Sequence, residues 1–475
     1  METMNKFTKY FLIILPIIIL LILVVLEMMS RSAAVIFNNV MAEQQMLNGT
    51  ITVEKIKATP MGEVSFNNLL WKDERGGTIV DIEEGSFKFR LWDILTNNFK
   101  STTIQELLLT NANISLDLDE NMNVDFIRHS PDFQKVSRDM KKNNESWTTK
   151  VSCVNKTEEE LKEIGEHRRK LQRSKIEEGW KNFNLEGRKI RLNLKLNNCQ
   201  FEIFYRDRHY LLRGVKLDTN INTDDEMILN VRTGTFGGTM IGRAMEIHGK
   251  IDFKPKPVPQ CDLTILLQEV DPSSLGFGLN IHDEMTLLAN FTGPVNQPVG
   301  KGTVKMKELH IPGLDFTNVE GNIYYEDSML NFKNVIADVY DGKLSAYGDY
   351  NFDTRYYNIY GHGDKLKIYS ALPKSHLHCN IDLDLTIQSK GNSKDIITSG
   401  SFTSDKGRYR ILMFNSISGK FKTEYRDIHF YDVAIDMGSY KVATDALSIV
   451  DKKLHLNPIK ITDENGDLVT TYIHN

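Results

Sequence analysis

Apolar and polar residues alternate with a period of two through most of the chain after residue 48. The clearest runs have these apolar members: Phe87, Phe89 and Leu91; Ile114, Leu116 and Leu118; Ile190, Leu192, Leu194 and Leu196; and Ile381, Leu383, Leu385 and Ile387. Because successive side chains of a strand point to opposite faces, each run predicts a strand with one apolar face. Turn signals at residues 76–77, 341–342, 361–363 and 465–466 separate such runs. We therefore expect a mainly β protein whose antiparallel sheet has one solvent-exposed polar face and one apolar face shielded from water.

One segment has helical spacing instead, with a high density of charge. Residues 157–183 place Leu161, Ile164, Leu171 and Ile176 at intervals typical of a helix, with acidic residues in the first turn. Residues 130–155 before it are expected to form a loop. Two interpretations are open: a solvated helix within a loop insertion, or a cap over one end of the sheet.

The N-terminus contains the longest apolar stretch. Residues 10–26 carry no charge, and residues 10–29 include only Glu27, which is about the length needed to span a bilayer. A cleaved signal peptide is the alternative, with residues 32–34 near a small-residue cleavage site, but its apolar region is usually shorter. Lys6 and Lys9 precede the stretch, so the positive-inside rule leaves residues 1–9 in the cytoplasm.

Composition excludes several classes of function. The 475 residues include 58 basic and 63 acidic ones, which gives a net charge of −5. There is no excess of positive charge to neutralise the phosphates of a nucleic acid. Four cysteines are scattered singly, which suits neither a zinc ribbon nor a dense disulfide scaffold; one or two long-range disulfides stay open. Catalytic motifs of metalloproteases, serine hydrolases and nucleotide-binding enzymes are missing, so we expect no enzyme.

Isolated candidates for chemistry have structural explanations. His376 and His378 share a strand face, but no second cluster accompanies them, so neither a metal nor another cofactor is predicted. Residues 117–128 start like a calcium loop but lack its glycine and final glutamate. Trp71 and Trp92 are expected to pack within the N-terminal part of the sheet, with anchoring at the bilayer surface as the alternative.

Similar strand meanders recur about a hundred residues apart, at 212–242, 319–348 and 417–442. Repeated units that bury their faces against neighbours favour an elongated, stacked architecture. A dry sheet face must be covered, and the chain offers little helix to cover it. Either the sheet folds on itself as a sandwich, or it curls into a groove whose dry side holds an apolar ligand such as a lipid acyl chain.

The order of segments resembles the AsmA-like and TamB-like family. The N-terminal unit of that family is similar to residues 49–53, 60–71, 82–89, 91–95 and 104–118, and its C-terminal repeat signature is similar to residues 339–348. The resemblance implies an inner-membrane helix followed by a repeating β-groove in the bacterial periplasm. It also implies lipid traffic toward the outer membrane, as in bridge-like lipid transfer proteins.

These observations lead to one hypothesis and one alternative. The hypothesis is a single-pass inner-membrane protein whose curled periplasmic β-groove binds phospholipids or other acyl lipids and serves phospholipid transport or envelope homeostasis, with outer-membrane or periplasmic proteins as further partners. The expected parts are a span at 10–29, a first β unit at 48–128, the loop and helical insertion at 129–183, and groove repeats at 184–298 and 299–475. All the apolar residues of the four runs above are expected to line the groove. The alternative is an anchored β-sandwich scaffold without lipid cargo.

Overall fold

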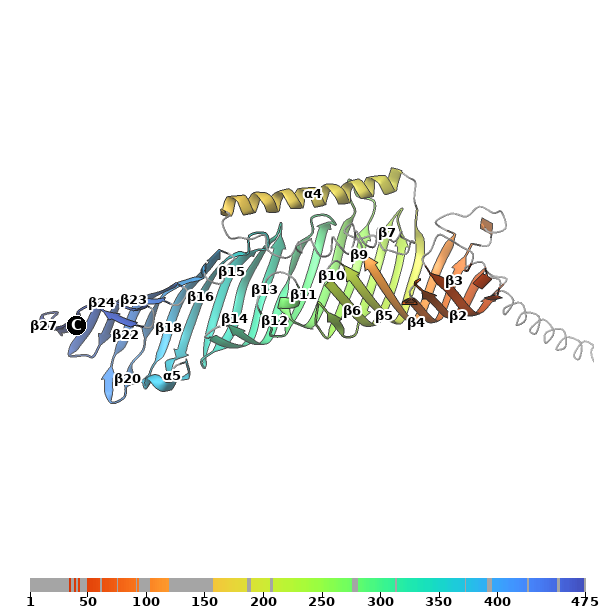
Figure 1. Cartoon of the computed structure of the whole chain (residues 1–475). Helices are drawn as coiled ribbons and strands as arrows, with labels where there is room; N and C mark the ends of the chain where they lie inside the picture. The colour runs from red at the N-terminus through yellow and green to blue at the C-terminus, as the bar shows by residue number, and fades with distance from the viewer. Residues whose placement is uncertain are drawn as a thin grey trace, which may run out of the picture. The chain divides into compact units, whose positions relative to one another are not determined.

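A computed structural model shows a mainly β chain (Figure 1). It describes residues 34–35, 38–39, 42, 49–59, 62–74, 76–90, 92–93, 103–118, 157–185, 189–205, 208–275, 281–311, 314–371, 373–390, 395–424, 427–450 and 453–473. The chain divides into two compact units. Unit 1 is Met1–Thr149 with Trp180–Pro259, and unit 2 is Lys150–Gly179 with Gln260–Asn475.

Unit 1 is one sheet in which β1 to β6 pair in sequence order, β7 follows β6, and β9 follows β7. A short strand, β8, pairs with the far part of β6. The strands are β1 (Thr50–Ala58), β2 (Glu63–Lys72), β3 (Thr78–Phe89), β4 (Ile104–Leu118), β5 (Arg191–Tyr205), β6 (Arg208–Asn222), β7 (Glu226–Thr233), β8 (Phe236–Gly238) and β9 (Ala244–Asp252).

The sheet of unit 1 is not wholly antiparallel, which corrects the expectation from sequence. β4 and β5 run parallel, from Glu106 opposite Asn193 to Leu118 opposite Tyr205. A parallel pair needs a connection that returns to the starting end of the sheet, which takes a dozen residues or more. The segment between Leu118 and Arg191, which contains the helical insertion, supplies this return.

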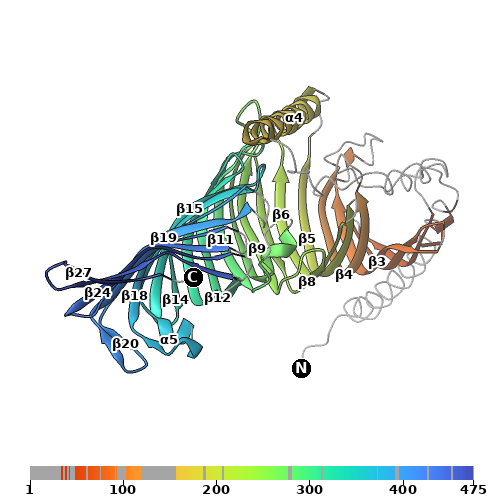
Figure 2. The same cartoon turned by 60° about the vertical axis from the view of Figure 1, so that its left-hand side comes forward.

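Unit 2 is a long antiparallel meander, β10 to β16, then β18, β19, β22, β23, β24, β26 and β27. These strands are β10 (Gln260–Val270), β11 (Met285–Pro294), β12 (Val299–Ile311), β13 (Leu314–Glu326), β14 (Met329–Val339), β15 (Gly342–Asn351), β16 (Tyr356–Lys367), β18 (Asn380–Lys390), β19 (Ile397–Ser404), β22 (Ser416–Glu424), β23 (Asp427–Asp436), β24 (Tyr440–Val450), β26 (Ile459–Asp463) and β27 (Leu468–Tyr472). β25 (Lys453–Leu456) also pairs with β24. Figure 2 shows the strand direction turning steadily along this unit as the sheet coils.

Unit 2 also contains smaller elements. A second sheet is formed by β17 (Leu377–His378), β20 (Gly407–Tyr409) and β21 (Leu412–Phe414). Short helical turns lie at η1 (Pro272–Leu275), α5 (Ile368–Ala371) and η2 (Pro373–Ser375). The long helix α4 (Glu158–Leu185) belongs to unit 2 up to Gly179. It begins with a capping box, in which Thr157 and Glu160 each bond the other's backbone amide group. Within the part of the chain that the structure describes, no helix is both long and apolar enough to cross a bilayer. The predicted span at residues 10–29 lies outside that part.

Many strands carry a β-bulge at a residue with positive φ. Asn111 in β4 and Asn198 in β5 have φ near 51° and 53°, and the Asn198 side chain donates a hydrogen bond to Asn111 at 2.8 Å. Asparagine tolerates this left-handed conformation better than most residues do. Each bulge shifts the alternation by one position, so Leu196 is followed on the apolar face by Cys199, three residues later. Bulges increase strand twist, which favours coiling of the sheet.

The side chain of Asn38 pairs with the outer edge of β1 at one position. Asn38, one of the helical residues before the sheet, donates to the carbonyl oxygen of Val53 at 2.8 Å and accepts from its amide group at 2.7 Å. This pairing satisfies both backbone polar groups of Val53, which would otherwise be open to another strand.

Two local expectations from sequence are wrong. Residues 361–363 do not form a turn but lie inside β16, where Gly361 faces Leu385 and Gly363 faces Leu366. Trp92 is 71% exposed, whereas Trp71 packs against the apolar cluster of unit 1 as expected.

Candidate functional site

The apolar face of unit 2 is continuous across many strands. One row of directly paired residues crosses β13, β14, β15, β16 and β18, and consists of Ile323, Phe332, Gly348, Ile359 and Ile387. A second row crosses β16 to β24, and consists of Gly361, Leu385, Gly400, Phe421, Phe430 and Leu447. Every member of both rows is half-buried, so part of each remains accessible. We call these two rows the apolar floor.

Glycines opposite large side chains make the surface of the apolar floor flat. A Cβ atom added to Gly348 would lie 2.8 Å from the ring of Phe332, and one added to Gly400 would lie 2.9 Å from the ring of Phe421. The large side chain therefore lies over the neighbouring strand rather than standing away from the sheet. Aromatic rings that cover cross-strand glycines also stabilise a sheet where glycine would weaken it. The result is a low-relief apolar surface.

One end of the same face is closed by a packed core. Met306, Phe316, Val339 and Leu366 are at most 7% exposed and belong to one buried cluster, against which Leu383 packs. These residues lie toward the strand ends opposite α4, because β13 and β15 start there and β12 and β16 end there. The packed core therefore closes one side of the apolar floor, while the two rows of the floor remain partly accessible to solvent.

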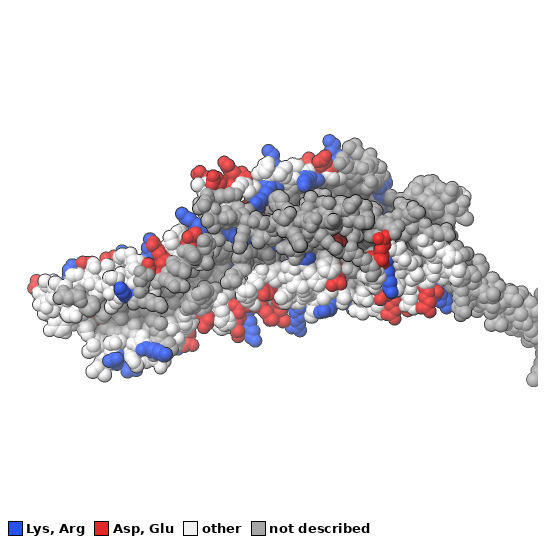
Figure 3. All heavy atoms as spheres, viewed as in Figure 1, with Lys and Arg blue, Asp and Glu red and all other residues white. Residues whose placement is uncertain are grey.

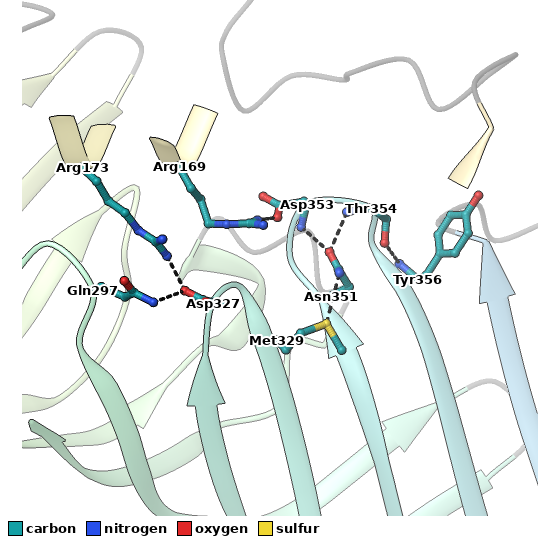
Figure 4. Close-up of polar contacts among 9 residues, drawn as sticks. All are labelled: Arg169, Arg173, Gln297, Asp327, Met329, Asn351, Asp353, Thr354 and Tyr356. Atoms are coloured by element: carbon teal, nitrogen blue, oxygen red, sulfur yellow. Dashed lines mark hydrogen bonds and ion pairs between the residues drawn. The ribbon is translucent and has the colours of Figure 1, made fainter. Parts of the chain in front are cut away.

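Helix α4 lies along the hairpin turns at the other strand ends (Figure 4). Arg173 pairs with Asp327 in the β13–β14 turn, and Gln297 of the β11–β12 turn donates to the same carboxylate at 3.0 Å. Arg169 pairs with Asp353 in the β15–β16 turn. These contacts favour the interpretation of the helix as a cap over one end of the sheet.

Close approach of the helix depends on a glycine. A Cβ atom at Gly165 would lie 2.5 Å from the carboxyl carbon of Asp353, so a larger residue would push the helix away. Leu161, one turn earlier, is only 2% exposed. The exposed side of α4 carries both signs of charge (Figure 3).

A pocket of about 830 Å³ lies at this rim, between the start of α4 and the strand ends. Its lining is Lys162, Met329, Asp349, Asn351, Thr354, Tyr356, Tyr357, Asn358, Gln388, Ser389, Lys390, Asp395, Ile396, Ile397, Glu424 and Asp427. Burial raises the pKa of Tyr357, and a hydrogen bond with Ser389 opposes that shift. A second aromatic ring lies next to the pocket, because Tyr350 stacks with the pocket residue Tyr357 at a centroid distance of 6.4 Å.

The residues predicted from the sequence to line a groove fall into two sets. In unit 2, Ile381, Leu383, Leu385 and Ile387 share the apolar face of β18, and the last two belong to the apolar floor. In unit 1, Phe87, Phe89, Ile114, Leu116, Leu192 and Leu194 are half-buried on β3, β4 and β5; Ile190 directly precedes β5, and Leu118 ends β4. Leu91 lies outside the described residues.

Unit 1 is packed more tightly on its apolar side. Leu196 is 5% exposed and belongs to a buried cluster with Leu109 and Val215, against which Phe87, Ile114 and Leu194 pack. The register brings these strands together, with Leu194 directly opposite Leu107 and Ile114 opposite Phe201.

Sequence reasoning missed most of the apolar floor in unit 2. Phe332, Ile359, Phe421 and Phe430 were not in the four clearest alternating runs, because bulges and glycines interrupt the apolar pattern of their strands. A signal was present: phenylalanine in one strand recurs opposite glycine in the next.

The described residues were compared with the metal-site expectation from sequence. No group of three or more His, Cys, Asp or Glu residues among them could hold a metal ion, and Cys199, Cys261 and Cys379 are free thiols. The ring of His378 stacks on Tyr369, with centroids 4.6 Å apart. The floor itself can make non-directional contacts with an apolar ligand. Comparisons of the chain with protein-family models, curated proteins and solved structures give no match.

Proposed function

We propose that this chain binds lipid acyl chains on the apolar floor of unit 2. The observation that carries the proposal is the row of half-buried apolar residues that crosses five neighbouring strands, in which Gly348 is covered by the ring of Phe332. Five strands at about 4.8 Å spacing make a surface about 19 Å long. Each CH₂ group removed from water there gains about 0.8 kcal/mol, so a long acyl chain can be held without specific polar contacts.

Further parts of the proposal rest on sequence. Residues 10–29 anchor the chain in the bacterial inner membrane, and the remainder forms a periplasmic groove that contributes to phospholipid transport or envelope homeostasis. The resemblance to AsmA-like and TamB-like proteins and the lysines before the apolar stretch support these parts.

A scaffold without lipid cargo is the second candidate. The tightly packed cluster of unit 1, where Ala112 and Cys199 are fully buried, favours it. In a scaffold the apolar floor of unit 2 would be a weakly packed surface with no ligand.

Lipid analysis of matched variants distinguishes the two. The full chain is purified in a mild detergent, and phospholipid per protein is measured by mass spectrometry for the wild type, Ile359→Asp and Ser399→Asp. Ser399 is the control because it lies on β19 opposite Thr386, on the other face of the sheet from the apolar floor. The proposal expects less lipid in Ile359→Asp and an unchanged amount in Ser399→Asp. Equal lipid in all three, or none in the wild type, contradicts it.

A further inference from the structure

A β-hairpin of unit 2 presents apolar side chains to solvent. β20 and β21 are joined at a tip where Ile411 is 91% exposed, the largest exposed fraction of any large hydrophobic residue among those described. Met413 is 65% exposed, Leu412 54% and Tyr409 43%. Figure 1 places this hairpin and α5 at the edge of the unit 2 sheet opposite α4.

The base of the hairpin is held firmly, so the exposed tip has a defined position. Phe414 is 6% exposed, and a Cβ atom at Gly407 would lie 2.6 Å from both the Phe414 ring and the Cys379 side chain. The amide group of Arg410 donates to the carbonyl oxygen of His376 at 3.1 Å, and β17 pairs with β20.

Three basic residues precede the apolar tip, on and beside β20. Lys406, Arg408 and Arg410 are all exposed, and the guanidinium of Arg410 lies over the ring of Tyr409, 5.7 Å from its centroid. Asp405, the acidic residue before Lys406, accepts hydrogen bonds from Asn380 at 2.9 and 2.8 Å. Figure 3 shows Lys and Arg atoms on this lobe of unit 2.

We propose that this hairpin docks on a bilayer that contains anionic lipids. Ile411, Leu412 and Met413 would enter the boundary between headgroups and acyl chains, while the arginines contact the phosphates and Tyr409 lies at the interface. Charge complementarity favours this partner, because three exposed basic residues lie on the β20 side of the tip. A protein partner is less well suited, since a projecting tip of four apolar side chains is far smaller than the roughly 800 Å² that each partner of a stable protein interface buries. The proposal does not depend on lipid cargo in the groove.

A fluorescent probe at the tip tests this docking directly. The full chain carries Ile411→Cys with Cys153→Ser and Cys379→Ser, is labelled with an environment-sensitive dye, and is held in phosphatidylcholine nanodiscs. The parent chain without Ile411→Cys is the control for background labelling of the two remaining cysteines, Cys199 and Cys261, which are buried. A matched chain carries the dye at Ser345→Cys, an exposed position in β15. Vesicles of phosphatidylcholine, with or without 30% phosphatidylglycerol, are then added.

The proposal expects a blue shift at position 411 with phosphatidylglycerol vesicles and none at position 345. Neutralising both arginines (Arg408→Gln with Arg410→Gln) is expected to weaken vesicle affinity about thirtyfold, since each basic residue near an anionic surface contributes about fivefold. The apolar contribution is tested with an unlabelled Leu412→Asp and Met413→Asp double variant, whose vesicle affinity should fall while its melting temperature matches the wild type. No shift at position 411, or equal shifts with and without phosphatidylglycerol, overturns the proposal. A shift that appears only with added protein extract identifies a protein partner instead.

Discussion

The substitution Ile387→Asp tests whether the apolar floor is accessible to solvent or is a sealed core. Ile387 is half-buried, directly opposite Ile359 and Thr398. Full burial of an isoleucine side chain contributes about 1.5–3 kcal/mol, so its partial loss, with the poor strand propensity of aspartate, is expected to lower the free energy of unfolding by about 1–2 kcal/mol. The new carboxylate retains access to water and needs no buried partner.

The same substitution in the core should behave differently. Leu366 is 7% exposed within the buried cluster of unit 2. Leu366→Asp loses the packing of the whole side chain and buries an unpaired charge, which together are expected to cost about 4 kcal/mol or more. Gln388→Asp is the matched control, because the position is adjacent to Ile387 but exposed on the other face.

Urea unfolding and lipid content, measured on the same preparations, decide the outcome. Ile387→Asp should stay folded and lose phospholipid, Leu366→Asp should unfold, and Gln388→Asp should resemble the wild type in both measurements. If Ile387→Asp unfolds as readily as Leu366→Asp, the floor is a sealed core and the reasoning fails. Full lipid content in a folded Ile387→Asp variant would refute it equally.

Three further predictions concern α4, the bulges and pH. Arg169→Ala leaves Asp353, which is 18% exposed, without its ion-pair partner; hydrogen exchange of α4 should accelerate about tenfold, for a loss of about 1–2 kcal/mol, and unchanged protection would argue against the cap. Asn111→Ala places alanine at a φ near 51° and should cost about 1–2 kcal/mol in urea unfolding, with Asn111→Gly costing less; equal losses would show that the backbone conformation is not the cause. A hydrogen bond and attraction to Asp283 raise the pKa of His310, so the pair stabilises the fold below the usual histidine pKa and this contribution fades as pH rises through the raised one. His310→Ala should therefore destabilise the chain more at about pH 5.5 than at about pH 8.5, and the reverse order of urea midpoints would contradict the assignment.

Period-two alternation predicted the fold class because it follows directly from strand geometry. The runs that contain Leu192 and Leu385 both lie in strands, and the turn at residues 465–466 joins β26 to β27. A helix is also present where helical spacing indicated one, in α4. These features depend on local sequence, which a single chain displays.

Features that depend on partner strands could not be predicted in the same way. The parallel pairing of β4 with β5 is set by where the chain returns after residue 118, and no local pattern encodes that return. The glycines at 361 and 363 predict a turn because glycine is frequent in turns, whereas Gly361 accommodates Leu385 from the next strand. The positive φ at Asn198 breaks the alternation between Leu196 and Cys199, so a strict period of two follows only half of β5.

The candidate site was predicted in part for the same reason. Leu385 and Ile387 lie on the apolar floor, but Phe332 and Phe421 join it through pairings with glycines that are distant in sequence. Burial could not be predicted either, since Leu196 and Leu194 have the same pattern while only Leu196 belongs to the buried cluster.

Photo-crosslinking in living cells tests lipid binding on the apolar floor most directly. A photoreactive amino acid replaces Ile387 in the full chain, and the exposed neighbour Gln388 receives the same group as control. After irradiation, mass spectrometry of the purified protein identifies adducts. The account predicts phospholipid adducts at position 387 and none at position 388. Crosslinks from position 387 only to other parts of this chain, with no lipid adduct, would contradict it.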